Sequence, residues 1–443
     1  DQDHDVMNAW FVLLLVGFPC CLSVPVSESS PFLSVSHRDL SFQGNQVFLN
    51  GANLAWINYG RDFGNNQTNG IRCELQEYVR NVSESGGNSM RVWLFVQGTS
   101  IPLFDSQGNV QGTDAAGSLV EDLRTFVRYA ASQNVFVILC LWNGALMVDG
   151  NAKNLVLNSE KLKTFIDNAL TPMVTALADE PGIGAWEIMN EPEGSVHIGA
   201  DSERCFDTTG LSNTGAGWSK ADVEMKDLLR FHNWQAAAIH DADPKALVTV
   251  GSWAEFVVTD RPLDPTKTFF NYYKDECLVK AGGKKNGVLD FLQVHTYPQS
   301  GKFDVGSPLS VPFVSFDLNK PLLIGEFASK PCKSTGCTPQ QLYELALNTS
   351  YAGLLDWSLW GGDTMDNEAL AMTGMHALAG DRRVVVDIKK HVTPPPDTCS
   401  CSDVSPSKSY TCSQQASFGK CGQSWMKGFC CRSCFACQGC SSM

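Results

Sequence analysis

Eight short apolar segments, spread over residues 47–360 and separated by helical patterns, constrain the fold of this chain most strongly. Several are almost continuously apolar, such as VFVILCLW (135–142) and KALVTVGSW (245–253). Continuous apolar runs are typical of parallel strands that are buried on both faces. We therefore predict strands at residues 47–54, 89–95, 135–142, 183–190, 247–252, 291–295, 322–326 and 353–360.

Helical patterns lie between these segments. Residues 118–132 carry apolar side chains at helical spacing and begin with Ser118-x-x-Glu121, the pattern of a capping box. A second helix is predicted over residues 222–241, ahead of Asp243-Pro244. Strands that alternate with helices in this way predict an α/β protein, a (β/α)8 TIM barrel. A doubly wound sheet is the alternative, but no Gly-rich phosphate-binding motif follows the first strand.

The first residues predict secretion. The apolar run Trp10–Phe18 is too short to span a bilayer and fits the central part of a signal peptide that starts at Met7. We therefore expect residues 1–27 to be upstream residues and a signal peptide, and the protein to be extracellular without a membrane span. A buried N-terminal helix is the alternative. Three sequons, at Asn66, Asn81 and Asn348, permit glycosylation.

The cysteines divide the chain. Nine of the 17 lie in residues 399–440, after the proline run at 394–396. Crowded cysteines in a short secreted segment indicate a disulfide framework, although the Cys-x-x-Cys spacings at 434–440 could also hold zinc. We predict a barrel domain over residues 28–391, a Pro-rich linker over 392–398 and a disulfide-rich C-terminal module over 399–443. In the barrel domain, Cys332 and Cys337 could close a short loop, and Cys140 is expected to be a buried free thiol.

Charge and motifs limit the partners. A net charge of −14 argues against nucleic acid and anionic membranes as partners. The chain has no H-E-x-x-H, EF-hand or Walker motif, so we expect neither a metal nor a cofactor. We also expect a monomer.

Two glutamates at strand ends point to the chemistry. The active site of a (β/α)8 barrel lies at the C-terminal ends of its strands. Glu191 and Glu326 each stand at the end of an apolar strand. Two carboxyl groups that face one cavity can cleave a glycosidic bond, if one is held protonated and the other stays ionised. For either glutamate alone, a structural ion pair with Arg91 is the alternative. His, Tyr, Asn and Trp side chains at the other strand ends favour the catalytic interpretation.

The motifs that contain these glutamates carry a family resemblance. WEIMNEP (186–192) and LIGEF (323–327) resemble the acid/base and nucleophile motifs of glycoside hydrolase family 5, in clan A. GANLAWINYGRDFG (51–64), MRVWLF (90–95), VHTYP (294–298) and LLDWSLW (354–360) follow in the order of that family. The resemblance covers about residues 34–390 and is strongest to animal-type endo-β-1,4-mannanases. It implies a secreted retaining enzyme that cleaves internal bonds of mannan, glucomannan or galactomannan by double displacement. An endo-β-1,4-glucanase of the same family, or a non-catalytic β-glycan-binding or matrix protein, remain the alternatives.

The resemblance also implies roles for individual residues. Glu191 resembles the general acid/base and Glu326 the nucleophile. Arg91 would keep Glu326 ionised, and Tyr297 would donate a hydrogen bond to it. Asn190 would bind the sugar 2-OH.

Further residues would line the substrate cleft. His295 would lie beside the acid/base, and Trp357 resembles the aromatic platform under the sugar at subsite −1. Trp142 stands where many family members have a His-containing turn after the third strand, and we expect it to contact substrate on the leaving-group side. Trp56, Trp218 and Trp253 are either further platforms or core residues.

The Cys-rich module resembles small modules that are appended to secreted carbohydrate-active and matrix enzymes. Its partner would be a glycan or a protein. Tyr410, Phe418, Trp425 and Phe429 could form an aromatic face for a polysaccharide. Alternatively, Trp425 and Phe429 form the small core of the module.

Overall fold

The computed structural model describes residues 30–147, 150–329, 336–360 and 368–395, and, in the C-terminal module, residues 405–406, 410–421, 423–426 and 430. The predicted signal peptide, Cys332 and Phe429 lie outside these described residues. No helix within the described ranges has both the length and the apolarity that a bilayer crossing requires.

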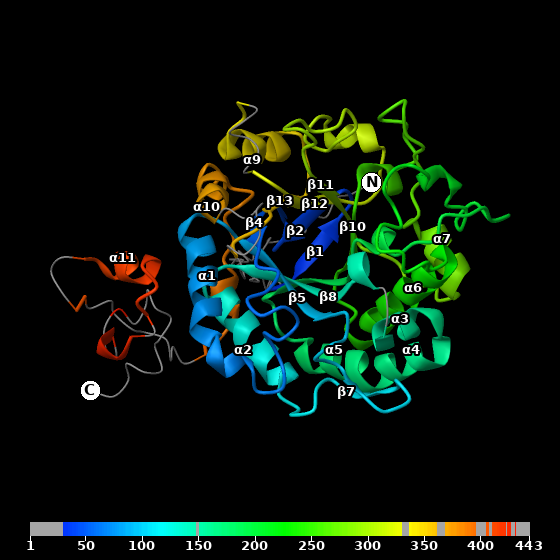
Figure 1. Cartoon of the computed structure of the whole chain (residues 1–443). Helices are drawn as coiled ribbons and strands as arrows, with labels where there is room; N and C mark the ends of the chain where they lie inside the picture. Colours follow the sequence, from blue (N-terminus) through cyan, green and yellow to red (C-terminus); the bar gives the residue numbers. More distant parts are fainter. Residues whose placement is uncertain are drawn as a thin grey trace, which may run out of the picture.

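Eight parallel strands close into a barrel around the centre of the molecule (Figure 1). They are β4 (Leu49–Asn53), β5 (Ser89–Val96), β8 (Phe136–Asn143), β9 (Ile183–Asn190), β10 (Val248–Ser252), β11 (Leu292–Thr296), β12 (Leu322–Phe327) and β13 (Gly353–Asp356). Each strand pairs with the next along the chain, and β13 pairs with β4 to close the ring. The predicted (β/α)8 barrel is therefore confirmed, and every predicted segment overlaps its strand.

Helices surround the barrel (Figure 1). The α-helices of this part are α1 (Arg72–Glu84), α2 (Leu119–Ser132), α3 (Gly150–Leu157), α4 (Ser159–Phe165), α5 (Thr171–Leu177), α6 (Met225–Ala242), α7 (Asp275–Gly282), α9 (Pro339–Asn348) and α10 (Glu368–His376). Short helical segments are η1 (Thr68–Gly70), η2 (Gly144–Leu146), η3 (Ile166–Leu170), η4 (Pro192–Gly194), η5 (Thr209–Leu211), η6 (Glu255–Val257), η7 (Phe313–Phe316) and η8 (Ile388–His391). The two helices predicted from periodicity are α2 and α6.

The N-terminus of α2 is capped differently from the prediction. The side chain of Ser118 makes no capping hydrogen bond. Instead, Asp114 accepts hydrogen bonds from the backbone N–H groups of Ser118 (3.0 Å) and Leu119 (3.2 Å). A carboxylate is a stronger acceptor than a hydroxyl group, and its charge suits the positive end of a helix. The predicted capping box is therefore wrong.

An antiparallel sheet that the apolar pattern did not predict closes one end of the barrel. It consists of β1 (Leu33–Ser36), β2 (Asp39–Phe42) and β3 (Asn45–Val47), dark blue in Figure 1. Its buried side chains Leu40 and Phe42 share one core cluster with Phe136, at the start of β8. The Phe42 and Phe136 rings lie 5.5 Å apart. The β1–β3 sheet therefore covers the end of the barrel at which the strands start, and the cleft lies at the end at which they finish.

A second small strand pair, β6 (Leu103–Phe104) and β7 (Val110–Gly112), lies in the loop after β5.

Two strand glycines make room for polar side chains inside the barrel. A Cβ atom on Gly251 would lie 2.5 Å from Glu187 Oε1, and one on Gly325 would lie 1.8 Å from Gln293 Oε1. Glycine in a strand interior marks such close approaches. The glycines therefore allow a charged layer to lie below the active-site end.

Disulfides join distant segments in both parts of the chain. Cys205 in the loop after β9 is bonded to Cys277 in α7. Cys140 in β8 is buried and free, as predicted.

The described part of the C-terminal module is built around a disulfide. It contains α11 (Cys412–Ser417) and η9 (Ser424–Met426), and Cys412 is bonded to Cys430. The buried cluster consists of Cys412, Met426 and Cys430, whereas Trp425 is 49% exposed. The alternative that Trp425 and Phe429 form the core of the module is therefore wrong for Trp425, while Phe429 lies outside the described residues.

Candidate active site

Two carboxyl groups face each other at the mouth of the barrel. Glu191 directly follows β9, and Glu326 lies near the end of β12. The Nδ1 atom of His295, in β11, lies 3.0 Å from Glu191 Oε1 and 3.5 Å from Glu326 Oε2. An oxygen of each carboxylate and this nitrogen all lie within 4.8 Å of one another. Both glutamates line a cavity of about 390 Å³. The structure thus brings together the two glutamates that the sequence predicted.

The turn after β9 directs Glu191 into this cavity. Glu191 has a left-handed backbone conformation, with φ +42°, and its N–H donates to the carbonyl oxygen of Gly251 at 2.6 Å. Non-glycine residues rarely adopt this conformation, and it occurs preferentially at functional sites. Burial raises the pKa of Glu191 to about 7. A large share of this side chain therefore remains protonated near neutral pH.

Glu326 receives hydrogen bonds at both oxygens. Arg91 Nη1 lies 2.7 Å from Oε1, and the Tyr297 hydroxyl group donates to Oε2 at 2.7 Å. Burial raises the pKa of Glu326, although the positive charge of Arg91 and the hydrogen bond from Tyr297 oppose this effect. The contacts that the sequence predicted for Arg91 and Tyr297 are present. The effect of burial is larger than theirs, so the pKa of Glu326 is raised and not lowered.

His295 is held in its neutral form. Burial lowers the pKa of this ring to about 4, so at pH 7 it carries a single N–H. With that hydrogen on Nδ1, the ring would donate to Glu191, as the 3.0 Å distance allows. His295 lies beside the candidate acid/base, as predicted, and touches the candidate nucleophile as well.

Below the two catalytic candidates, Arg91 is fully buried and binds a third glutamate. Its Nε and Nη2 atoms lie 2.6 Å and 2.5 Å from the two oxygens of Glu187. Gln293 also donates to Glu187, at 2.8 Å. Burial alone would raise the pKa of Glu187, but the charge and hydrogen bonds of Arg91 outweigh it, and the net pKa is lowered. Glu187 is therefore ionised, and Arg91 bridges it to Glu326.

Sequence reasoning missed the role of Glu187. Its signal was present, because Glu187 is a charged residue in the middle of an otherwise apolar strand. The structural ion pair with Arg91 that we considered for Glu191 or Glu326 is thus made chiefly by Glu187. Asn53 completes this network by accepting a hydrogen bond from Arg91 Nη1 at 2.9 Å.

The same arginine orients Asn190. Arg91 Nη2 donates to Asn190 Oδ1 at 2.8 Å, and the amide nitrogen of Asn190 donates to Asn143 Oδ1 at 3.3 Å. With its oxygen bound to Arg91, the amide presents its N–H groups on the cavity side. Asn190 lines the cavity, so it can donate to a sugar hydroxyl group there.

Aromatic side chains form one wall of this cavity. The Trp357 ring lies 5.8 Å from both Trp56 and Trp93, and Trp56 lies 4.8 Å from Tyr59. All four residues line the cavity. Trp357 follows β13, which ends at Asp356, four residues earlier than predicted. Trp357 therefore occupies the position expected for a sugar platform, and Trp56 joins it there.

Trp142 does not reach the cleft. Its side chain is fully buried on the helix side of β8, where its ring lies 4.9 Å from that of Phe165 and its Nε1 donates to Gln235 at 3.0 Å. Side chains alternate along a strand, so the next residue, Asn143, faces the cavity instead. The prediction that Trp142 contacts the substrate is wrong, and Trp142 is a core residue.

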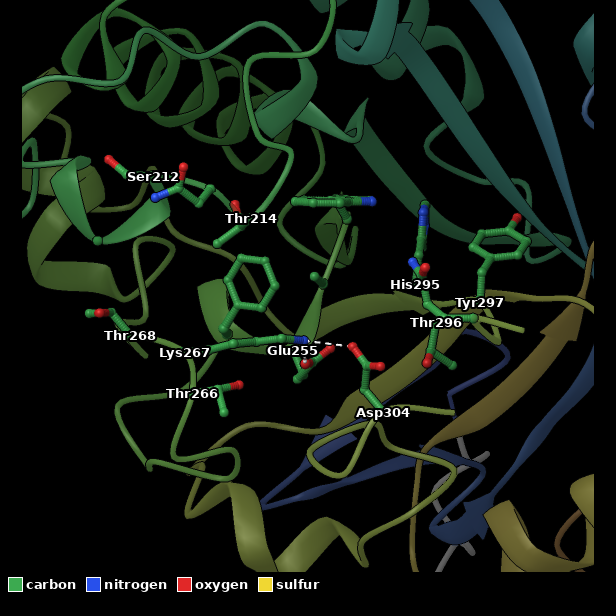
Figure 2. Close-up of a pocket in the computed structure, with 16 residues that line it drawn as sticks. Ser212, Thr214, Glu255, Thr266, Lys267, Thr268, His295, Thr296, Tyr297 and Asp304 are labelled. Atoms are coloured by element: carbon green, nitrogen blue, oxygen red, sulfur yellow. Dashed lines mark hydrogen bonds and ion pairs between the residues drawn. The ribbon is translucent and has the colours of Figure 1, made fainter. Parts of the chain in front are cut away.

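A second cavity extends the cleft beyond His295. It has a volume of about 440 Å³ and shares Tyr297 with the first cavity. In Figure 2, His295 and Tyr297 lie at one side, with Lys267 and Asp304 in the floor. Trp253 lines it, and Trp218, whose ring is 5.0 Å away, packs against Trp253.

A further buried carboxyl group positions Trp253. Glu193 accepts a hydrogen bond from the backbone N–H of Trp253 at 3.0 Å and another from the hydroxyl group of Tyr273. Burial raises the pKa of Glu193 to about 7. Sequence reasoning missed this residue as well, because a glutamate in a loop gives no sign of burial.

A (β/α)8 barrel with two opposed carboxyl groups and an aromatic wall at its strand ends has the equipment of a glycoside hydrolase. Comparison with known proteins identifies the family. The family model described as Cellulase (glycosyl hydrolase family 5) matches residues 43–363. This chain belongs to glycoside hydrolase family 5.

Animal proteins are similar over almost their whole length. A mannan endo-1,4-beta-mannosidase of Cryptopygus antarcticus is 46% identical over 354 residues, which are 80% of this chain and 91% of that protein. The protein of the same name from Mytilus edulis is 43% identical over 329 residues, 74% of this chain and 87% of its own length. The crystal structure of an endo-1,4-beta-mannanase from Eisenia fetida has a TM-score of 0.76 at 40% identity, and covers 81% of this chain and 99% of its own.

Proposed function

We propose that this protein is a secreted endo-β-1,4-mannanase that hydrolyses internal bonds of mannan, glucomannan or galactomannan and retains the anomeric configuration. The observation that carries the proposal is the pairing of Glu191 and Glu326 around His295, within 4.8 Å. Relatives named mannan endo-1,4-beta-mannosidase support mannan as the substrate.

The short separation of the carboxylates supports the retaining mechanism. Retaining glycosidases hold their carboxyl groups about 5–5.5 Å apart, whereas inverting enzymes leave space for a water molecule at about 6.5–9.5 Å. Glu326 would attack the anomeric carbon while Glu191 donates its proton to the leaving oxygen. Glu191 would then remove a proton from water, which attacks the same carbon and releases Glu326. Both steps use these side chains and water.

The surrounding residues would support both steps. Arg91 and Tyr297 hold Glu326 by hydrogen bonds that direct its carboxylate toward the cavity. Asn190 would donate to the sugar 2-OH, an interaction that strengthens in the transition state. Trp357 would pack against the face of the sugar in subsite −1. Because these groups are in place before substrate arrives, they need little reorganisation during the reaction.

Hydrolysis assays test this proposal. The purified protein would be incubated with galactomannan, glucomannan and carboxymethyl-cellulose side by side, and the release of reducing sugar measured. We expect release from both mannans and little from the cellulose derivative. Release mainly from carboxymethyl-cellulose would favour an endo-β-1,4-glucanase, the alternative that the family name supports. No release by a folded protein would favour a glycan-binding role.

Variants and product analysis test the mechanism. Glu191→Gln and Glu326→Gln should each lower kcat by several orders of magnitude while the circular dichroism spectrum stays that of the wild type. Proton NMR of the first product should show the β anomer ahead of mutarotation. The α anomer as the first product would exclude the retaining mechanism.

The secreted location is supported by the cysteine chemistry. Disulfides such as Cys205–Cys277 form in oxidising compartments. Among the sequons, Asn66 and Asn348 are exposed, whereas the side-chain nitrogen of Asn81 donates to Glu368 at 3.0 Å. Expression in eukaryotic cells tests the location. We expect the protein in the medium, with a glycan on Asn66 or Asn348, and retention inside the cells would contradict it.

For the C-terminal module we propose a glycan partner. Tyr410, Phe418 and Trp425 are about half exposed, at 51%, 54% and 49%, on a segment whose buried cluster uses none of them. Exposed aromatic side chains offer rigid apolar faces that suit sugar rings, and those of Tyr410 and Trp425 also carry a hydrogen-bonding group. In a pull-down with insoluble mannan, Trp425→Ala should reduce the bound fraction, and Gln423→Ala should not. Equal binding of both variants would favour a protein partner or no separate role.

A further inference from the structure

We propose that the second cavity binds the part of the substrate that leaves, and that Lys267 determines how tightly this part is held. The proposal rests on the proposed function, because it concerns the same cleft. It adds the residue that determines the affinity of the cleft for the leaving part of the substrate.

The position of the cavity determines which part of the substrate it can receive. The sugar that Glu326 attacks must occupy the first cavity, which contains Glu326, Asn190 and Trp357. The leaving oxygen must lie at Glu191, which would protonate it. His295 contacts Glu191 at 3.0 Å and lines the second cavity. The chain beyond the cleaved bond can therefore pass over His295 and Tyr297 into the second cavity (Figure 2).

The walls of the two cavities differ in chemistry. The first presents five aromatic side chains, of which Tyr297 also lines the second, and their faces suit the apolar faces of sugar rings. The floor of the second carries Lys267, Glu255 and Asp304, and hydroxyl groups of Ser212, Thr214, Thr266 and Thr268 also line this cavity. Ligand sites use such placed polar groups to determine orientation and specificity. The second cavity is thus suited to sugar hydroxyl groups and ring edges.

Lys267 is fixed before a ligand arrives. Its Nζ atom lies 2.7 Å from Asp304 Oδ2 and 3.0 Å from Glu255 Oε1, and the Phe256 ring centre is 5.1 Å away. An ammonium group has three N–H donors, so two acceptors leave a donor for a sugar hydroxyl group. Because the long side chain is already held, binding costs little additional side-chain entropy. The carboxylates Glu255 and Asp304 act as positioning residues for Lys267.

The chain offers a matched control for this lysine. Lys274 also pairs with an aspartate, with Nζ 3.2 Å from Asp260 Oδ2, and lies 4.1 Å from the centre of a phenylalanine ring, Phe270. Lys274 does not line either cavity described above. Lys274→Met therefore removes a similar ion pair outside the proposed site.

The test compares two substrates on the full-length protein. Mannohexaose can extend into the second cavity, whereas an aryl β-mannobioside places only its aryl group beyond the cleaved bond. A charge-assisted hydrogen bond in an open cleft corresponds to about a tenfold change in binding. In Lys267→Met we expect KM for mannohexaose to rise about tenfold more than KM for the aryl substrate, and Lys274→Met should show no such difference. Equal changes of KM on both substrates would overturn the proposal.

Lys267→Met leaves the buried Glu255 without its counter-charge, which could prevent folding. Two milder variants therefore test the same proposal. Thr268→Val removes a hydroxyl group from the cavity, and Asp304→Asn releases Lys267 from a half-exposed partner. Each should raise the same KM ratio by about threefold, and unchanged ratios in both would also overturn the proposal. If the wild-type protein cleaves glucan instead of mannan, the experiment is repeated with cellohexaose and an aryl β-cellobioside. The cavity assignment is thus tested separately from the choice of sugar.

Discussion

Arg91 and Glu187 form a doubly hydrogen-bonded ion pair in the interior of the barrel, at 2.6 Å and 2.5 Å, and both side chains are fully buried. The pair lies one layer below the cleft, and Arg91 reaches from it to Glu326 and Asn190. The orientation of both functional groups therefore depends on a carboxylate that does not line the cleft cavity.

Glu187→Gln should destabilise the protein and lower its activity. The change leaves Arg91 in the interior without its main counter-charge, and breaking a buried pair costs about 3–5 kcal/mol. We expect a free energy of unfolding about 3 kcal/mol lower in urea titrations, and a reduced kcat. Asp167→Asn breaks the exposed pair with Lys163 and should cost much less, because exposed ion pairs contribute little to stability. Equal stabilities of the two variants would contradict this assignment.

The activity should fall on both sides of a pH optimum. Glu191 must be protonated to donate to the leaving oxygen, so kcat/KM should decline as pH rises through its pKa of about 7. Glu326 must be ionised to attack, and its pKa is raised, so the acidic limb should lie above the usual range of a glutamate. A pH profile of kcat/KM with mannohexaose measures both limbs. Activity that stays constant from pH 6 to pH 9 would argue against Glu191 as the acid.

The same pKa shift predicts a cost in stability. A carboxyl group whose pKa is higher in the folded state binds more protons folded than unfolded, so stability falls as pH rises between the two values. For Glu191 this window runs from its ordinary value of 4.5 to about 7. Glu191→Gln keeps the shape without the charge, and should be more stable than the wild type by about 1–2 kcal/mol at pH 8. At pH 4 the two proteins should unfold at nearly the same urea concentration, and an equal difference at both pH values would refute this explanation.

The barrel was predictable because its signal is local. Each strand is buried on both faces, so it appears as a short apolar run, and Glu191 and Glu326 stand out because charges end such runs. The sheet β1–β3 was not predictable from that pattern, because its short strands alternate polar and apolar residues in a segment rich in turns.

The side-chain partners depend on which face of each strand a residue occupies. Trp142 and Asn143 are neighbours in sequence, yet one packs against the helices and the other lines the cleft. A long apolar run does not show which of its residues point inward. The pairing of Glu187 with Arg91 was not predictable either, because the two residues are 96 positions apart in the chain.

Trp142 and Trp357 should respond differently to the same substitution. Trp142→Phe removes a core ring and the donor to Gln235, so we expect a loss of about 2 kcal/mol in unfolding free energy with KM nearly unchanged. Trp357→Phe reduces the platform in the cleft, so kcat/KM should fall about tenfold or more while stability changes less. Urea titration and steady-state kinetics on the two variants separate these roles. A rise in KM for Trp142→Phe alone would restore it as a substrate contact.

Removing the disulfide between Cys205 and Cys277 should lower stability more than activity. It joins residues 72 positions apart, and closing a loop of that length stabilises the folded state by about 4 kcal/mol in the chain-entropy description. The bond anchors the loop after β9 to α7, and neither cysteine lines the cavity that contains the two catalytic candidates. In the double variant Cys205→Ala, Cys277→Ala we therefore expect a lower Tm but kcat close to the wild-type value at 25 °C. If the variant has the same Tm as the wild type, the other contacts of the loop are sufficient to hold it in place.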